Sequence, residues 1–300
     1  MTAPVTAPAV EPAVRCLDRT GIQPWLPLLD EWLLPGNAYS VHHTWPLLYR
    51  SDGWGSFFAI LADDRLVSHC ATRDVTIRGE HGAFDATLLG SVATDPELRG
   101  RGLAGRVLAA ALADCDARGR PVLLWAERPE LYARHGFVPG RPERCALLAR
   151  RPLTAAAGEV RLAEVRDHGA IHALHEQKPW CVVRTAAETS GLLTTPGLRA
   201  MVSERDGAVV AYACCGKGAD LQDHWHEVGG ADADVAALLQ AAMHHCGQIE
   251  AVLLVPPYRP GLCDALGRSV VDEFCVEGPM TRSASGGALP ACWIDGLDSV

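Results

Sequence analysis

Residues 88–104 read LLGSVATDPELRGRGLA, and this stretch constrains the fold of the chain around it. Its first half is apolar and predicts a buried strand, which Asp95-Pro96 ends. Arg99-Gly100-Arg101-Gly102 follows, and a helical pattern of apolar residues begins at Leu103. Glycines let backbone N–H groups approach a ligand, and the first turn of a helix leaves its amides unpaired. Because two arginines stand beside those amides, the stretch predicts an anion-binding site.

The loop differs from the two commonest nucleotide loops. It lacks Gly-Lys-Ser/Thr, and no acidic residue follows about 20 positions later, as a dinucleotide site requires. It resembles instead the pyrophosphate loop of the GNAT acetyltransferases, R/Q-x-x-G-x-G/A, at Arg99, Gly102 and Ala104. Residues 131–137, LYARHGF, resemble the later YxxxGF turn of that family, with a helix at about 101–118 and an apolar strand at 121–125 between. The alternative is a structural glycine turn.

The resemblance implies a mixed α/β fold in which helices flank a mostly antiparallel sheet. It covers residues 15–152, where the strands from 137 to 149 are expected to complete the sheet. The order of elements is repeated afterwards, so residues 159–282 predict a second, degenerate GNAT-like unit in tandem. Its loop carries Asp232 and Asp234, which would repel a pyrophosphate, and one cofactor per chain is expected.

The remaining segments are short. Residues 1–14 are rich in proline and alanine and predict a disordered tail, and residues 151–158 predict a linker. A Ser/Gly-rich tether at 283–287 precedes the terminal residues 291–300, ACWIDGLDSV. Because four large apolar side chains there would be costly in water, we expect this terminal segment to dock.

Composition narrows the class of protein. The 300 residues are 48% hydrophobic, enough for two cores, and the net charge of −9 argues against nucleic acid while favouring cationic substrates. An uninterrupted apolar run long enough for a membrane span is missing, so no membrane partner is expected. Eleven cysteines without a C-x-x-C pair favour reduced thiols and a cytoplasmic location. The sequence leaves the oligomeric state open.

The resemblance implies acetyl-CoA as co-substrate and assigns site residues. Tyr132 would protonate the departing CoA thiolate, since free tyrosine has a pKa of about 10. The strand end would offer backbone amides to the pantetheine and the thioester carbonyl, and the loop would bind the pyrophosphate. The residues assigned to cofactor binding are Val92, Ala93, Thr94, Arg99, Gly100, Arg101, Gly102, Leu103 and Ala104.

The general base is left open. Family members use a strand carboxylate, a water chain or the chain's own C-terminus. The candidates in this sequence are Glu127, Asp85, His42, His43 and the terminal carboxylate of Val300, with Asp298 beside it. The terminal segment is expected either to return to the first unit near Tyr132 or to pack on the second unit.

Histidines suggest a metal site only by spacing. His168, His172 and His175 share one face of an expected helix, and His224 and His226 one face of a strand. A carboxylate or cysteine that would complete a known ligand spacing is missing, so no metal is expected.

The sequence therefore predicts an acyltransferase that moves an acetyl group from acetyl-CoA directly to a primary amine. The tandem arrangement is similar to the enhanced-intracellular-survival type of acetyltransferase, although this chain is shorter and has no room for a third domain. The alternative is a non-catalytic acyl-CoA-binding sensor or interaction module. The identity of the amine is left open.

Overall fold

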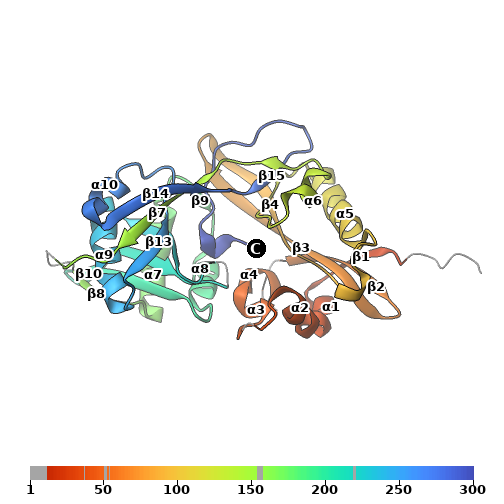
Figure 1. The fold of residues 1–300 in the computed structure, drawn as a ribbon, viewed down its shortest axis with the longest axis horizontal. Helices are drawn as coiled ribbons and strands as arrows, with labels where there is room; N and C mark the ends of the chain where they lie inside the picture. The colour runs from red at the N-terminus through yellow and green to blue at the C-terminus, as the bar shows by residue number, and fades with distance from the viewer. Residues whose placement is uncertain (1–11, 37, 51–52, 54, 154–157, 219–220) are drawn as a thin grey trace, which may run out of the picture.

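The computed structural model describes residues 12–36, 38–50, 53, 55–153, 158–218 and 221–300. Two lobes, each built on a mixed sheet flanked by helices, lie side by side, and the C-terminus lies between them (Figure 1). The predicted mixed α/β tandem is confirmed. Most of the predicted tail, and residues 154–157 of the predicted linker, lie outside the described residues. Val14 already belongs to the first strand.

The first sheet has the order β1–β2–β3–β4–β5–β15–β6, and β9 pairs with β3 off this path. Strands β2 to β4 form an antiparallel meander, which turns at Asp63-Asp64 and between Gly79 and Gly82. The bounds are β1 (Val14–Leu17), β2 (Gly55–Ala62), β3 (Arg65–Gly79), β4 (Gly82–Thr94), β5 (Val122–Leu124), β15 (Met280–Arg282), β6 (Val138–Pro139) and β9 (Cys181–Val182).

Helices cover both faces of this sheet. Consecutive residues Phe57 and Phe58 point to opposite faces, so one packs under the N-terminal helices and the other under α5. The N-terminal group is α1 (Arg19–Ile22), η1 (Gln23–Trp25), α2 (Leu26–Leu33), α3 (Val41–Thr44) and α4 (Pro46–Tyr49). The other group is η2 (Pro96–Leu98), α5 (Leu103–Ala117) and α6 (Pro129–Ala133).

The second sheet has the order β14–β7–β13–β12–β11–β10–β8. Its bounds are β14 (Val270–Val276), β7 (Glu143–Ala149), β13 (Glu250–Leu254), β12 (His224–Gly230), β11 (Ala208–Cys215), β10 (Arg199–Arg205) and β8 (Glu159–Leu162). Helices α7 (His168–Glu176), α8 (Ala186–Leu193), α9 (Asp232–His245) and α10 (Leu262–Leu266) flank it, with the short turns η3 (Val165–Asp167), η4 (Gly267–Ser269) and η5 (Gly296–Asp298).

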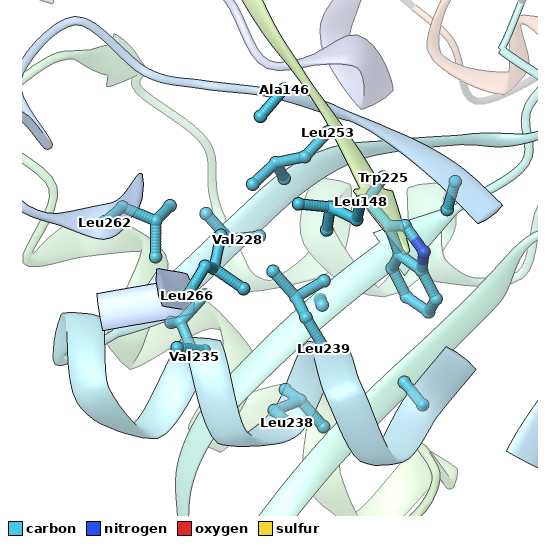
Figure 2. Packing of buried hydrophobic residues seen from close by; sticks show 14 of the residues in the cluster. Ala146, Leu148, Trp225, Val228, Val235, Leu238, Leu239, Leu253, Leu262 and Leu266 are labelled. Carbon is cyan, nitrogen blue, oxygen red and sulfur yellow. The ribbon is translucent and has the colours of Figure 1, made fainter. Parts of the chain in front are cut away.

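The two sheets exchange one strand each. Strand β7 lies between β13 and β14 in the second sheet, and β15 lies between β5 and β6 in the first. Figure 2 shows Ala146 and Leu148 of β7 packed with Trp225, Val228 and Leu253 in the core of the second lobe. The expectation that strands 137–149 complete the first sheet is therefore wrong for β7. An alternating apolar pattern fixes a strand, but the choice between two open sheet positions depends on contacts far along the chain.

Candidate active site

Strands β4 and β5 part from one another and open the first sheet. Their parallel ladder covers Thr87↔Val122 and Leu88↔Leu123 in the described structure. On the other side of β4, two residues, Ser91 and Val92, face the single residue Cys70 of β3, which makes a β-bulge. The β4 backbone beyond Leu88 therefore borders the opening, and the predicted cofactor residues Val92, Ala93 and Thr94 lie along it.

The bulge is held in a strained conformation. Ser91 has φ 52°, a left-handed value that costs a non-glycine residue on the order of 1 to 3 kcal/mol. The buried His69 ring donates from Nδ1 to the Ser91 carbonyl oxygen at 3.0 Å. Burial lowers the pKa of His69 to about 4, so the ring is neutral near pH 7 and Nε2 carries the lone pair. His69 thus fixes the Ser91 peptide in the shape of the bulge.

The loop after β4 leads into an uncapped helix. Asp95 accepts the Glu97 N–H at 3.0 Å and pairs with Arg65, which fixes the first turn of the loop. Gly100 and Gly102 have φ 78° and 77°, a region that favours glycine. Helix α5 starts at Leu103 with no side-chain cap and no acidic residue in its first turn.

The exposed Arg99 and Arg101 flank this helix start, and Arg99 Nε donates to the Thr94 carbonyl at 3.3 Å. The loop residues predicted to bind the cofactor therefore form one continuous surface with the end of β4. The free amides of Leu103 and Ala104, the positive end of the helix dipole and the two guanidinium groups all favour an anion there.

We expect Gly102→Glu to weaken acetyl-CoA binding by at least about 30-fold, because the change strains the turn and puts a carboxylate at the helix N-terminus. Gly119→Glu is the matched control. Gly119 also has a positive φ, of 65°, and open space around it, but it lies beyond the other end of α5. Calorimetry gives both affinities and the stoichiometry, expected to be one acetyl-CoA per chain. Equal affinity in the two variants, or two equivalents per chain, would contradict the assignment.

The corresponding helix start in the second lobe is already neutralised. Strands β12 and β13 part after Trp225↔Leu253, as β4 and β5 do, but α9 begins with Asp232. Arg259 donates to Asp232 Oδ1 at 2.8 Å and to the Gly230 carbonyl at 2.7 Å. A carboxylate and its own arginine thus occupy the position at which a pyrophosphate would bind, which supports a single cofactor site.

Tyr132 lies on the α5 side of the first sheet. It belongs to α6, and its ring forms a T-shaped pair with the ring of Phe137, with the two centroids 6.0 Å apart. Burial, helped by Cys70 and Glu127, raises the pKa of Tyr132 to about 12. The hydroxyl is therefore a proton donor near pH 7. Glu127 itself is exposed, in the turn between β5 and α6.

The terminal residue Val300 lies on the opposite face of β4. Its side chain packs with apolar residues of both the N-terminal helices and the β4–β5 region. A Cβ atom at Gly90 would lie 2.4 Å from the Val300 carbonyl oxygen, so the terminal carboxyl group rests directly on the glycine backbone. The structure thus brings Val300 to the strand that carries the bulge.

The other candidate bases lie elsewhere. Asp85 is exposed in the first half of β4 and accepts hydrogen bonds from Thr76 and Arg120. His42 and His43 bond to Ser40 at the start of α3. The hydrogen bonds described for these side chains do not involve the bulge residues. His42 and His43 instead line a small pocket together with Gly191, Thr194 and Thr195 of the second lobe.

One cluster among the described residues has metal-ligand chemistry. His175, Glu227 and Asp295 place their ligand atoms within 4.8 Å of one another. The Lys178 ammonium lies 2.7 Å from Asp295 Oδ2 and 3.3 Å from Glu227 Oε1, and so supplies the positive charge itself. His168 bonds to a serine hydroxyl instead.

Glu143, at the start of β7, is a perturbed carboxyl group that the sequence analysis did not consider. Burial raises its pKa to about 7, and Trp125 Nε1 donates to Oε1 at 3.3 Å, which opposes that shift. The sequence gives no signal for this, because the burial of Glu143 depends on the exchange of β7 between the sheets.

Glu143 makes folding stability depend on pH. The folded protein keeps its proton up to about pH 7, whereas the unfolded chain loses it near 4.5, so stability falls as pH rises between these values. Glu143→Gln removes this loss. Relative to wild type, we expect the variant to gain up to about 3 kcal/mol between pH 5 and pH 8. Denaturant unfolding at both pH values measures it, with the exposed Glu130→Gln as control. Parallel curves for wild type and Glu143→Gln would contradict the interpretation.

The first lobe, which carries the parted strands β4 and β5, matches a known protein family. Residues 18–140 match the family model described as an acetyltransferase (GNAT) domain. The chain therefore carries a GNAT acetyltransferase domain, an enzyme class that takes acyl groups from acetyl-CoA. None of the curated proteins matches the chain significantly. In the described part of the chain, every helix is too short or too polar to span a membrane.

Several solved structures share the fold across both lobes. A probable N-acyltransferase from Enterococcus faecalis is 13% identical with a TM-score of 0.70, over 90% of this chain and 72% of its own. A GCN5-related N-acetyltransferase from Kribbella flavida is 16% identical with a TM-score of 0.64, over 92% and 72%. Eis1 from Mycobacterium abscessus is 14% identical with a TM-score of 0.59, over 90% and 73%. The chain thus has the tandem GNAT fold.

Proposed function

We propose that the protein transfers an acetyl group from acetyl-CoA directly to a primary amine, with Val300 as general base and Tyr132 as general acid. The observation that carries this proposal is the terminal carboxyl group on Gly90. Tyr132 packs with the apolar cluster on the opposite face of the same sheet. In this proposal a proton acceptor and a proton donor act from the two faces of the sheet, at the opening between β4 and β5.

The reaction balances with these two groups. The amine nitrogen attacks the thioester carbonyl carbon, so a C–N bond forms and the C–S bond breaks. The Val300 carboxylate takes the proton that the ammonium must lose, and the Tyr132 hydroxyl protonates the CoA thiolate. Backbone N–H groups at the bulge polarise the thioester carbonyl, and the strained Ser91 keeps them in place.

The acceptor class follows from charge. The net charge of −9 favours cationic acceptors, and the proposed base needs an amine that arrives protonated. The alternative is a non-catalytic acyl-CoA sensor, which would keep the loop but would not need an acid and a base at the opening.

A screen of primary amines with acetyl-CoA tests the proposal by the release of free CoA thiol. The panel covers polyamines, amino sugars, lysine side chains and peptide N-termini, and mass spectrometry identifies the acetylated product. We expect thiol release that depends on the amine. Tight acetyl-CoA binding without release by any amine would favour the sensor.

A further inference from the structure

The C-terminal segment, residues 291–300, crosses from one lobe to the other (Figure 1). The backbone of Cys292 forms an isolated antiparallel β-bridge with Gly79 of the first sheet, and Leu297 packs in an apolar cluster of the second lobe. Asp295 and Asp298 are fully buried. The segment therefore ends in the first lobe after passing through a charged region of the second.

That region is a cluster of four buried charged residues of the second lobe, Lys178, Arg184, Lys217 and Glu227; with the segment removed they would line the surface hereafter called the charged cleft. The hydrogen bonds described for Lys217 Nζ all go to the terminal segment. It donates to the carbonyl oxygens of Gly296, Leu297 and Ser299 at 2.9, 3.1 and 2.6 Å, and to Ser299 Oγ at 3.1 Å. Such contacts with backbone carbonyls are those of a peptide-binding site.

The side chains of the segment neutralise the charged cleft. Arg184 Nη2 pairs with Asp298 Oδ2 at 2.6 Å and with Glu227 Oε2 at 2.8 Å. Lys178 bonds to Asp295 Oδ2 at 2.7 Å. Without the segment, the buried Lys178 and Arg184 would share the single carboxylate of Glu227, and Lys217 would lose its carbonyl acceptors, which is strongly unfavourable. The charged cleft therefore matches an acidic peptide.

The charged cleft of the second lobe lies at the position that corresponds to the proposed acceptor side of the first lobe. Gly296 lies against β12, where a Cβ would come 2.7 Å from His226 Cβ, just beyond the point at which β12 and β13 part. Leu297 packs on the face covered by α7 and α8. Val300 holds the corresponding place on β4 in the first lobe, under α1 to α4. The second lobe thus holds a peptide where the first would receive an acceptor.

We propose that the charged cleft is a binding site for the acidic C-terminal peptide of this chain, which remains bound and exchangeable when its covalent link is cut. The second lobe then serves as the holder of the terminal carboxylate. Binding by the charged cleft is independent of the proposed function, and only the effect on turnover rests on it.

A cleavable loop tests this. A protease site inserted between Gly286 and Gly287 lies in an exposed turn, so the full chain folds before it is cut. We expect the fragment from Gly287 to Val300 to co-elute with the body in gel filtration, and to exchange with an excess of the labelled synthetic peptide. A fragment that separates from the folded body at micromolar concentration would overturn the proposal.

The affinities of peptide variants show which contacts contribute to binding. Asp298→Asn in the peptide leaves Arg184 partly unpaired, so we expect at least about 30-fold weaker binding, against no change for the exposed Ala288→Ser. Equal binding of both peptides would overturn the charged cleft as the site.

A peptide amidated at Val300 separates this proposal from the proposed function. The charged cleft contacts the segment up to Ser299, so we expect the amide to bind within about threefold of the acid and to support no turnover. Full turnover with a tightly bound amide would refute Val300 as the base and leave the charged cleft standing. Loss of amide binding would contradict the charged cleft.

Discussion

Deletion of Val300 is expected to lower kcat for acetyl transfer by about 100- to 10,000-fold, the usual range for loss of a general base. The deletion withdraws the carboxyl group from Gly90 while the ion pairs of Asp295 and Asp298 stay in place. Val300→Ala is the matched control, since it keeps the carboxyl group and loses only apolar contact.

The measurement is kcat with an amine found in the screen, together with acetyl-CoA affinity and melting temperature. Acetyl-CoA affinity is expected to match wild type, and the melting temperature to match that of Val300→Ala, which also loses the apolar contact of the Val300 side chain. The deficit in kcat should shrink as pH approaches the pKa of the amine, because a neutral amine needs no base. Wild-type turnover without Val300 would place the base elsewhere.

Replacement of Tyr132 by Phe is expected to lower kcat by about 10- to 1,000-fold and to leave acetyl-CoA affinity unchanged. The physical reason is its pKa of about 12, which keeps the hydroxyl protonated beside the leaving thiolate. The ring and its contact with Phe137 are retained in the variant, so packing changes little.

Tyr258→Phe is the control for removal of a buried hydroxyl, since Tyr258 packs against Trp180 in the second lobe. Steady-state kinetics and calorimetry on both variants separate turnover from binding. If kcat stays at the wild-type value across the pH range, solvent rather than Tyr132 protonates the thiolate.

The first sheet and its loop are predictable because their signals are local. The strand, the break at Asp95-Pro96, the glycines and the helix from Leu103 follow one another within a few turns of chain. The meander is equally local, since Asp63-Asp64 and Gly79 to Gly82 mark its turns. Local chemistry of this kind is readable from one sequence.

The charged cleft and the exchanged strands have no such signal. No local pattern marks Lys217 and Arg184 as buried, and only the tertiary fold places Arg184 beside Asp298 and Lys217 beside Gly296, 114 and 79 residues later. The apolar C-terminus indicated docking, but its place on Gly90 depends on both lobes. The location of β7 depends likewise on β13 and β14, which follow it by long intervals.

Because β7 and β15 are exchanged between the two sheets, the first sheet can be completed only late in synthesis of the chain. In the described structure, β6 joins the first sheet through β15, which pairs Met280 with Leu124 and Pro139. A ribosome has therefore made residues 280–282 before the first lobe can close its sheet, and pairing across such a long stretch of sequence favours slow folding. A nascent chain that stops before Met280 lacks that strand. The first sheet, which carries the proposed catalytic site, is thus completed only after the second lobe has been synthesised.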